Sequence, residues 1–385
     1  MKKIYKAVLV GSGGFGVTYL NFFLNKVTED FELIGVVDPY AKRSSAFERF
    51  DGVYPIYERL EDFFNTGLKT DLVIIASPIH LHYSQCMTAL ENGVHVLCEK
   101  PIVPTVKELD TIEQKAKEVG KSVSVGFQWC YSKITLELKK RILEGRFGKP
   151  KCLKTIMSTP RDHAYYARNS WAGKKISDDG DIIYDSVISN ATSHHMQNIL
   201  FLLGDDMESS ASLKNVRTEL YRANNIETFD TCVLKGETDS TTVLFATTHA
   251  ANHSIGPMNY FIFEDATIFY NVIGQNNDIT IHYKNGEIEK LGNYLMNGTI
   301  DVVNHVAKIV NGTDSPICTP KTVRPFTNLI ETMFLKSPIN NFNEKYVVTL
   351  ENQTYVKHLH IDLMECFFHN KLPSDISMPW SKSSF

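Results

Sequence analysis

A glycine-rich turn near the start of the chain is the first group of residues whose spacing suggests chemistry. GSGGFG, residues 11–16, follows the apolar run YKAVLV and precedes the helix-like segment FGVTYLNFFLN. Gly11 permits a tight turn, Gly13 lets the backbone approach a pyrophosphate, and Gly16 lets the helix pack on the strand. Free N–H groups at the helix start would face the phosphates. The pattern predicts a dinucleotide-binding turn that also includes Gly14 and Phe15.

A carboxylate stands at the spacing that such a turn requires. Asp38 ends the second apolar run, ELIGVVD, about 20 residues beyond the glycines. Its oxygens would accept hydrogen bonds from ribose hydroxyls, and its charge would repel a 2′-phosphate, so NAD is the favoured cofactor. Lys42 and Arg43 lie just beyond it and keep NADP as the alternative.

A lysine followed by a proline is the first candidate for proton transfer. Lys100 comes at the exit of the strand-like run HVLCEKP. A lysine held at a strand end and partly desolvated loses its proton more readily than a free one, which suits acid and base catalysis. The alternative is a surface lysine that forms a salt bridge with its neighbour Glu99.

The elements that would position these residues alternate along the first third of the chain. The runs DLVIIAS, HVLCEKP and SVSVGF are separated by the helix-like segments HLHYSQCMTALENG and VKELDTIEQKAKEVG. This alternation predicts a doubly wound parallel sheet with helices on both faces. Ligands of such sheets bind beyond the carboxyl ends of the strands. Ser77, Pro78, Glu99, Lys100 and Gln128 all fall at such ends.

Composition sets the class of protein. The chain has 385 residues, 43% of them hydrophobic and 22% charged, with a net charge of −4, so nothing points to nucleic acid. No run reaches the roughly 18 apolar residues of a membrane helix. Seven scattered cysteines without a CxxC pair fit a reducing cytosol. We expect a cytoplasmic protein without nucleic-acid or membrane partners, with two domains over residues 1–126 and 127–385.

The segment TDLVIIASPIHLHYSQCMTALENGVHVLCEKP, together with the glycine turn, resembles the Gfo/Idh/MocA family of oxidoreductases. The resemblance covers the first domain strongly and the second weakly. It implies an NAD(P)-dependent enzyme that acts on CH–OH groups, with the catalytic Lys100 beside the nicotinamide and the substrate hydroxyl. It also implies a homo-oligomer, a dimer or tetramer, built through the outer face of an open sheet. The further residues that it places along the cofactor are Ser77, Pro78, His82, Glu99 and Gln128.

The character of the chain changes from Lys151 onward. Strand-like runs joined by short polar turns dominate, which is typical of antiparallel pairing. The sequence therefore predicts an α+β domain with an open, mainly antiparallel sheet. NATSHHMQNILFLLG and YVKHLHIDLMECFFHNK are its clear helices. The runs are KCLKTIMS, TCVLKG, TTVLFATTHA, MNYFIFED, ATIFYNV, DITIHY and EIEKLG.

Two adjacent histidines stand in the first of these helices. Counting back from Gly204, the family pattern DxGxH places its histidine on His194, with amides at Asn190 and Gln197 where the family has carboxylates. At about 100° per residue, His194 shares a polar arc with both amides, whereas His195 lies at the edge of the apolar arc. We expect His194 to act in catalysis, Asn190 to contact the substrate, and His195 to pack.

A metal site is the competing interpretation of the histidine pair. Adjacent histidines on a helix diverge by about 100°, whereas helical zinc pairs use i, i+4 spacing, so we predict no metal. The segment Thr159–Ser186 reads as a long polar and aromatic loop, and long loops near a site tend to be functional. Its Trp171 and Lys174, with His163 and Tyr165, are residue types that stack on sugars and bond hydroxyls.

Together these residues predict an oxidoreductase that transfers a hydride between a nicotinamide and a carbinol carbon of a sugar, cyclitol or related polyol. Lys100 and His194 would move the hydroxyl proton. The first alternative is glycoside cleavage by transient oxidation and elimination, with no net redox change. The second is a non-catalytic sensor that binds a dinucleotide and a protein partner.

Overall fold

The computed structural model describes residues 3–270, 278–295 and 297–381. The chain divides into two compact units. The first consists of Met1–Tyr131 and Asn297–Thr327, and the second of Ser132–Met296 and Asn328–Phe385. The first unit therefore takes in a late segment that the division at residue 126 assigned to the second domain. That segment is also the place of a helix that sequence analysis did not predict, α9 (Thr299–Val310).

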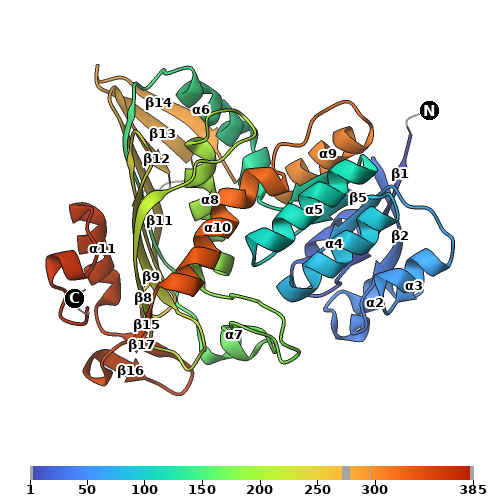
Figure 1. Ribbon diagram of the computed structural model, residues 1–385, viewed down its shortest axis with the longest axis horizontal. Coiled ribbons are helices and arrows are strands. Elements are labelled where there is room, and N and C mark those ends of the chain that lie inside the picture. The colour runs from blue at the N-terminus through green and yellow to red at the C-terminus, as the bar shows by residue number, and fades with distance from the viewer. Residues whose placement is uncertain (1–2, 271–277, 296, 382–385) are drawn as a thin grey trace. The chain divides into compact units, whose positions relative to one another are not determined.

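A parallel sheet forms the centre of the first unit (Figure 1). Its six described strands run in the order β3-β2-β1-β4-β5-β6, and each neighbouring pair is parallel. This is the order of a dinucleotide-binding fold, so the predicted doubly wound sheet is confirmed. The strands are β1 (Tyr5–Val10), β2 (Phe31–Val37), β3 (Ile56–Tyr57), β4 (Leu72–Ile75), β5 (His95–Cys98) and β6 (Val123–Val125).

Helices cover this sheet, and their ends follow local sequence. In α5, Thr105 caps the first turn by accepting a hydrogen bond from the backbone N–H of Glu108, and Gly120 takes the left-handed conformation at the end. Helix α5 packs beside α4. The helices of this unit are α1 (Gly16–Leu24), α2 (Phe47–Phe50), α3 (Leu60–Asn65), α4 (His82–Glu91), α5 (Val106–Val119) and α9.

A nine-stranded sheet of described residues forms the second unit, in the order β14-β13-β12-β11-β7-β10-β9-β8-β15. Only the β10–β7 and β15–β8 pairs are parallel, so the predicted open, mainly antiparallel sheet is confirmed. Strands β8 and β15 were not predicted, and the last two residues of the run ATIFYNV lie outside the described residues. The strands are β7 (Pro150–Ser158), β8 (Lys214–Arg222), β9 (Thr231–Glu237), β10 (Thr242–Thr248), β11 (Ile255–Phe263), β12 (Ala266–Tyr270), β13 (Asp278–Tyr283), β14 (Ile288–Asn293) and β15 (Ile339–Asn341).

Two helical segments of this unit differ from the structure that the sequence predicted. The predicted helix over NATSHHMQNILFLLG is interrupted at Thr192, where a π-helical turn (Val187–Ala191) gives way to α8 (Ser193–Leu202). The segment expected to be loop contains the short helix α7 (His163–Ala167), capped by the side chain of Asp162. The remaining helices are α6 (Lys133–Leu143), α10 (Pro320–Lys336), which crosses the boundary between the units in sequence, and α11 (Leu359–His369).

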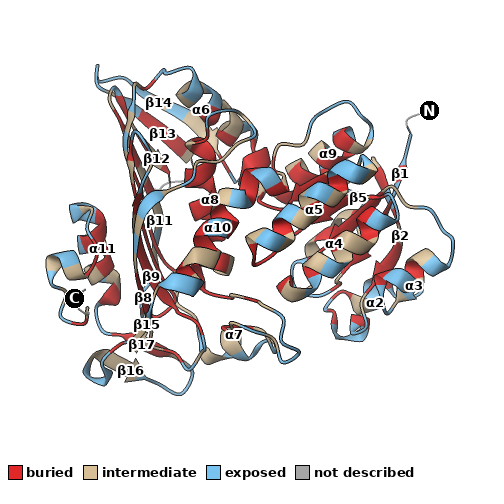
Figure 2. Cartoon of the chain, in the orientation of Figure 1, coloured by how far each residue is buried: buried red, intermediate tan, exposed pale blue. Residues whose placement is uncertain are grey.

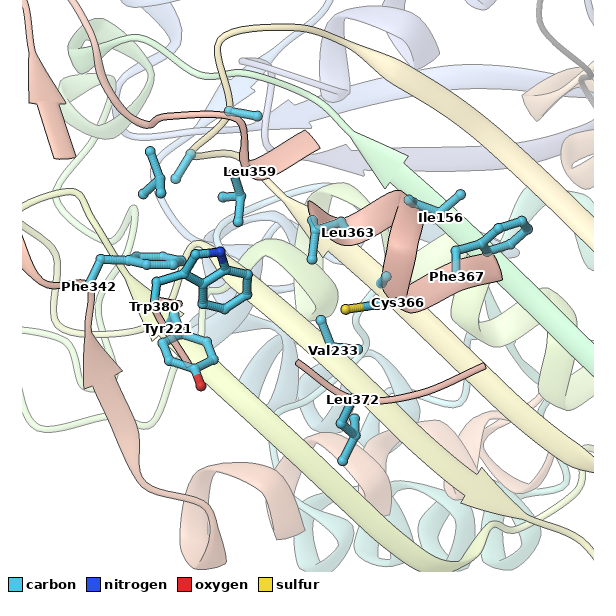
Figure 3. Packing of buried hydrophobic residues seen from close by; sticks show 14 of the residues in the cluster. Ile156, Tyr221, Val233, Phe342, Leu359, Leu363, Cys366, Phe367, Leu372 and Trp380 are labelled. Carbon is cyan, nitrogen blue, oxygen red and sulfur yellow. The ribbon is translucent and has the colours of Figure 1, made fainter. Parts of the chain in front are cut away.

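The C-terminal segment packs on one face of the large sheet. Leu359, Leu363, Cys366 and Phe367 of α11 are buried in one cluster with side chains of β7, β9 and β10 (Figure 3). Nε1 of Trp380 donates a 2.6 Å hydrogen bond to Asp362 and so ties the chain beyond α11 to that helix. Figure 2 shows the strands of the sheet as mostly buried. A short hairpin of β16 (Val347–Thr349) and β17 (Thr354–Val356) precedes the helix.

Candidate active site

The glycine-rich turn lies between β1 and α1, and its glycines serve different purposes. A Cβ at Gly11, where φ is +88°, would lie 2.7 Å from the carbonyl group of Ala76, and a Cβ at Gly16 would lie 2.0 Å from the Gly11 oxygen. These two positions exclude a side chain because of the protein's own packing. Gly13, by contrast, has nothing within 4 Å of an added Cβ. The open space at Gly13 suits a phosphate group that approaches the backbone closely.

The other two predicted residues of the turn, Gly14 and Phe15, face open space. Gly14 has a φ of +48° and no atom within 4 Å of an added Cβ. Phe15 is 44% exposed, and its ring lies edge-on to Tyr19 at 5.8 Å. Neither residue is held by the core, so both remain available to a ligand at the start of α1.

Asp38 is fixed beside the turn by Ser12. Oδ2 of Asp38 accepts hydrogen bonds from the backbone N–H of Ser12 at 2.8 Å and from its hydroxyl at 2.7 Å. Oδ1 accepts one from the backbone N–H of Tyr40 at 2.8 Å. The carboxylate is therefore oriented and lies close to the Gly-rich backbone, as ribose binding requires. Ser12 was not among the predicted site residues, although its position inside GSGGFG was the available signal.

Glu99 is a buried carboxyl group at the end of β5. It is 7% exposed, and its Oε1 accepts a 2.8 Å hydrogen bond from the hydroxyl of Tyr19. A Cβ at Gly126 would lie 2.8 Å from the same oxygen, so the glycine makes room for the carboxyl group. Burial raises the pKa of Glu99, while the charge of Lys100 and the Tyr19 hydroxyl oppose that rise.

Lys100 is half-buried beside this carboxyl group. Its backbone N–H donates a 3.2 Å hydrogen bond to Oε2 of Glu99, and a cis peptide bond joins it to Pro101. The hydrogen bond to Glu99 anchors the backbone of Lys100 to a buried carboxyl group. Lys100 therefore lies at the carboxyl edge of the sheet with its backbone fixed. This is the edge where ligands of doubly wound sheets bind.

His82 connects two strand ends. It is 1% exposed, with Nε2 2.8 Å from the carbonyl oxygen of Ser77 and Nδ1 3.1 Å from that of Pro101. Burial lowers its pKa, although the carbonyl contacts act in the opposite direction. Its ring thus holds the Ser77–Pro78 corner against the residue that follows Lys100. Direct contact of His82 with a cofactor stays a prediction.

Two polar side chains complete the carboxyl edge of the first unit. The Ser77 hydroxyl donates a 2.5 Å hydrogen bond to Oε1 of Gln85. Oε1 of Gln128, in the turn after β6, accepts a 3.1 Å hydrogen bond from the hydroxyl of Thr299. Thr299 starts α9, so this late helix orients a residue that the sequence placed at a strand end. Nothing local in the sequence pointed to Thr299.

In the second unit, Asn190 lies on the π-helical turn. Its Nδ2 donates a 2.8 Å hydrogen bond to Oδ1 of Asp185, and Oδ2 of Asp185 accepts a 2.7 Å hydrogen bond from the backbone N–H of Gly173. Asp185 is 3% exposed. A π-helical turn next to a polar cluster is frequent at functional sites. Asp185 thus orients the amide of Asn190.

The two histidines of α8 differ in environment. His194 is half-buried, whereas His195 is 6% exposed, and burial lowers the pKa of His195 to about 3, with an Asn259 side-chain hydrogen bond acting against that shift. His195 thus packs as a neutral ring. Gln197 is 1% exposed, and its Nε2 donates a 3.0 Å hydrogen bond to Ser210. Asn190, His194 and Gln197 were predicted to share one polar side of an unbroken α-helix. Because the helix breaks at Thr192, the spacing of about 100° per residue does not extend from Asn190 to the other two residues.

Trp171 and Lys174 lie on the segment that follows α7. The Lys174 ammonium group donates a 2.5 Å hydrogen bond to Asp178, and this contact raises its pKa. Trp171 is half-buried, with the guanidinium of Arg168 5.2 Å from its ring centre. His163, by contrast, faces the β16–β17 hairpin, where its Nε2 lies 3.0 Å from the hydroxyl of Thr354.

Within residues 3–270, 278–295 and 297–381, no three His, Cys, Asp or Glu side chains gather in a way that could hold a metal ion. No helix in the described part of the chain has the length and apolar character needed to cross a membrane.

Part of the first unit matches the model of a known family. Residues 5–127 fit the Gfo/Idh/MocA model, described as an oxidoreductase family with an NAD-binding Rossmann fold. The match covers β1 to β6 and contains the glycine turn, Asp38, Glu99 and Lys100. The resemblance seen in the sequence and the prediction of an NAD-binding fold are therefore confirmed.

Named relatives are similar over part of their length. Inositol 2-dehydrogenase of Streptomyces avermitilis is 26% identical over 56% of this chain and 57% of its own. D-glucoside 3-dehydrogenase of Escherichia coli is 28% identical over 31% of this chain and 34% of its own. The chain thus spans less than two thirds of the length of either relative.

A solved structure extends the likeness in fold. The WlbA dehydrogenase of Bordetella pertussis, crystallised with NADH and UDP-GlcNAcA, aligns with a TM-score of 0.71 at 19% identity, over 87% of this chain and 97% of that one. At this identity the likeness shows the fold alone. It includes residues beyond 127, outside the family match.

Proposed function

We propose that this chain, whose residues 5–127 belong to the Gfo/Idh/MocA oxidoreductase family, is an NAD-dependent dehydrogenase of a sugar, cyclitol or related polyol. The observation that carries the proposal is the turn after β1. Its packing excludes side chains at Gly11 and Gly16, leaves space at Gly13 and places the fixed carboxylate of Asp38 beside it. These residues fit the pyrophosphate and the adenine ribose of NAD. The inositol and glucoside dehydrogenases among the relatives support the substrate class.

The bound nicotinamide would accept or supply the hydride at the carbinol carbon. The chain's own residues would then bind, orient and move a proton. We assign proton transfer to Lys100 in the first unit and to His194 in the second, and substrate orientation to Asn190. Glu99, which is buried against Tyr19 and hydrogen-bonded to the backbone N–H of Lys100, would position the lysine.

The test combines cofactor binding with turnover. The purified protein is titrated with NAD and then with NADP by calorimetry. It is next mixed with NAD and a panel of polyols, sugars and glycosides while reduced nicotinamide is followed by absorbance. Steady formation of reduced nicotinamide with one class of substrate supports the proposal. Lys100→Met should lower kcat at least 100-fold while leaving the affinity for NAD within a few-fold of the wild type.

Two other outcomes would replace the proposal. Cleavage of a glycoside without net formation of reduced nicotinamide would indicate transient oxidation followed by elimination. Tight binding of NAD without turnover of any panel member, and without an effect of Lys100→Met, would indicate a dinucleotide-binding sensor.

A further inference from the structure

A cluster of cationic and aromatic side chains surrounds α7 in the second unit. We define this arginine cluster as Arg161, Tyr165, Tyr166, Arg168 and His249. The guanidinium carbons of Arg161 and Arg168 lie 4.5 Å and 3.7 Å from the ring centre of Tyr165. The Tyr165 ring in turn lies edge-on to Tyr166 at 5.2 Å and to His249 at 5.4 Å. Two guanidinium groups therefore share one aromatic ring.

The positive charge of the cluster is not balanced by an ion pair. Among the described residues, neither Arg161 nor Arg168 lies within 4.0 Å of a carboxylate oxygen. Nε of Arg161 is buried and has no hydrogen-bond acceptor in the described part of the chain. Each guanidinium group carries a positive charge, and an anion that contacted both would offset these charges.

The neighbouring acids are already engaged in other contacts. Asp162 caps α7 through a 2.8 Å hydrogen bond from the backbone N–H of Tyr165. Asp230 is fully buried and accepts hydrogen bonds from the backbone N–H and the side-chain amide of Asn224 at 2.8 Å and 2.9 Å. Asp185 accepts hydrogen bonds from Gly173 and Asn190, as described above.

His249 adds a buried donor to the cluster. It is 2% exposed, and burial, followed by the charges of Arg161 and Arg168, lowers its pKa to about 3, so the ring is neutral at pH 7. Its Nδ1 lies 3.4 Å from the hydroxyl of Tyr166, and its Nε2 has no partner among the described residues. If Tyr166 donates to Nδ1, Nε2 carries the proton and can donate to a ligand oxygen.

A short chain of contacts links the cluster to Asn190. Gly173 packs close to Tyr166, because a Cβ added at the glycine would lie 3.5 Å from Cδ1 of the tyrosine. The backbone N–H of the same glycine donates to Asp185, and Asp185 accepts the amide of Asn190. The cluster and the proposed substrate-orienting residue thus belong to one connected part of the second unit.

We infer that the arginine cluster binds an anionic substituent of the substrate, so that the substrate class is an acidic carbohydrate, carrying a carboxylate or a phosphate. The inference rests on the proposed function for its link to turnover. Arg161 and Arg168 would supply charge-assisted hydrogen bonds to the oxygens, since guanidinium groups suit carboxylate and phosphate geometry. His249 Nε2 would donate a further hydrogen bond. The ring of Tyr165 holds both guanidinium groups in place.

The experiment compares matched substrates and variants in the presence of NAD. For glucose, galactose and N-acetylglucosamine, the neutral sugar, its C6 carboxylate and its 6-phosphate are measured for binding by calorimetry and for kcat and KM. The variants are Arg161→Gln and Arg168→Gln. Arg146→Gln is the matched control, because Arg146 is exposed in the same unit and pairs with Glu144.

We expect at least one acidic form to be preferred over its neutral parent by tenfold or more, with the preference falling as salt rises. Arg161→Gln and Arg168→Gln should each raise KM for that acidic form at least tenfold and change KM for the neutral sugar less than threefold. The carboxylate and phosphate series show which anion the site takes. Arg146→Gln should match the wild type.

The results that would overturn this inference differ from those that would overturn the proposed function. Equal binding of acidic and neutral forms, or equal effects of the arginine substitutions on both, overturns the inference while leaving the proposed dehydrogenase intact. Binding of an acidic sugar that depends on Arg161, but without any hydride transfer, keeps the anion site and overturns the proposed function. No binding of any acidic form overturns the inference.

Discussion

The carboxylate of Asp185 accepts a 2.8 Å hydrogen bond from the side-chain amide of Asn190. An amide whose N–H₂ group is held in this way presents its oxygen in a defined direction. The same carboxylate holds the backbone N–H of Gly173 at 2.7 Å, so it joins the π-helical turn to the segment after α7. Asp185 is therefore a positioning residue for Asn190 and for the loop that carries Trp171.

Replacing this carboxylate should affect both stability and substrate binding. Asp185→Ala leaves the buried backbone N–H of Gly173 and the half-buried amide of Asn190 without their acceptor. A buried donor left unpaired costs about 1–3 kcal/mol. We expect a lower free energy of unfolding and, if Asn190 orients the substrate, a KM raised at least fivefold. Asp179→Ala, at an exposed residue of the same segment, should change neither. Chemical denaturation and steady-state kinetics measure both effects, and an unchanged KM in Asp185→Ala would contradict the positioning role.

Two glycines of one turn should respond differently to a methyl group. In Gly16→Ala the new Cβ would lie 2.0 Å from the Gly11 oxygen, so the turn must move and the fold should lose stability. In Gly13→Ala nothing lies within 4 Å, so the stability change should stay within about 0.5 kcal/mol. The affinity of Gly13→Ala for NAD should nevertheless fall at least tenfold. Thermal unfolding with and without NAD measures both, and normal NAD binding by Gly13→Ala would place the pyrophosphate elsewhere.

The cofactor preference should depend on Asp38. Its carboxylate is fixed by Ser12 and Tyr40, and it would repel the 2′-phosphate of NADP. Asp38→Ser should raise the ratio of NADP affinity to NAD affinity at least tenfold. Asp51→Ser, at an exposed residue of the same unit, serves as the control. Calorimetric titration with both cofactors measures the ratio, and an unchanged ratio would argue against ribose contact by Asp38.

Buried histidines should make the protein less stable in mild acid. The pKa of His195 is lowered to about 3 by burial, whereas an unfolded histidine has a pKa of about 6.5. The unfolded state therefore binds more protons below pH 6.5, and stability falls as pH decreases from there toward 3. His195→Gln removes one such group, so its loss of stability between pH 7 and pH 5 should be smaller by roughly 2 kcal/mol.

The control for this pH effect is His282→Gln, because His282 is exposed on β13. Its loss of stability between pH 7 and pH 5 should equal that of the wild type. Urea denaturation at both pH values gives the comparison. If His195→Gln and the wild type lose the same stability, His195 is protonated in the folded state and its assignment as a packed neutral ring is wrong.

A buried and an exposed residue of α11 together test how this helix packs on the sheet. Leu363 is fully buried in the cluster of Figure 3, so Leu363→Ala should lower the free energy of unfolding by roughly 2–5 kcal/mol. Ile361, two residues earlier, is 49% exposed, and Ile361→Ala should change it by about 0.5 kcal/mol or less. Denaturant unfolding of both variants checks the difference. Similar losses would mean that α11 does not stabilise the sheet face.

The sequence by itself determined the dinucleotide-binding half of the protein. Its strands are short apolar runs, its turn has no room for a side chain at Gly11 and Gly16, and Asp38 and Lys100 follow strands whose ends must meet at one edge. These are local signals, and a parallel sheet converts them directly into a site. The open sheet of the second unit was also predictable from alternation, except at β8 and β15, where polar residues dilute the pattern.

Only the tertiary structure decided which side chains meet across long stretches of chain. Thr299 reaches Gln128 from a helix 171 residues away, and His249 joins Arg161 and Tyr165 from the end of another strand. The break at Thr192 and the burial of Gln197 depend on packing around α8, which helical periodicity does not encode. Burial likewise turned His195 into a neutral core residue, because a pKa depends on the solvent and charges that folding places around the ring.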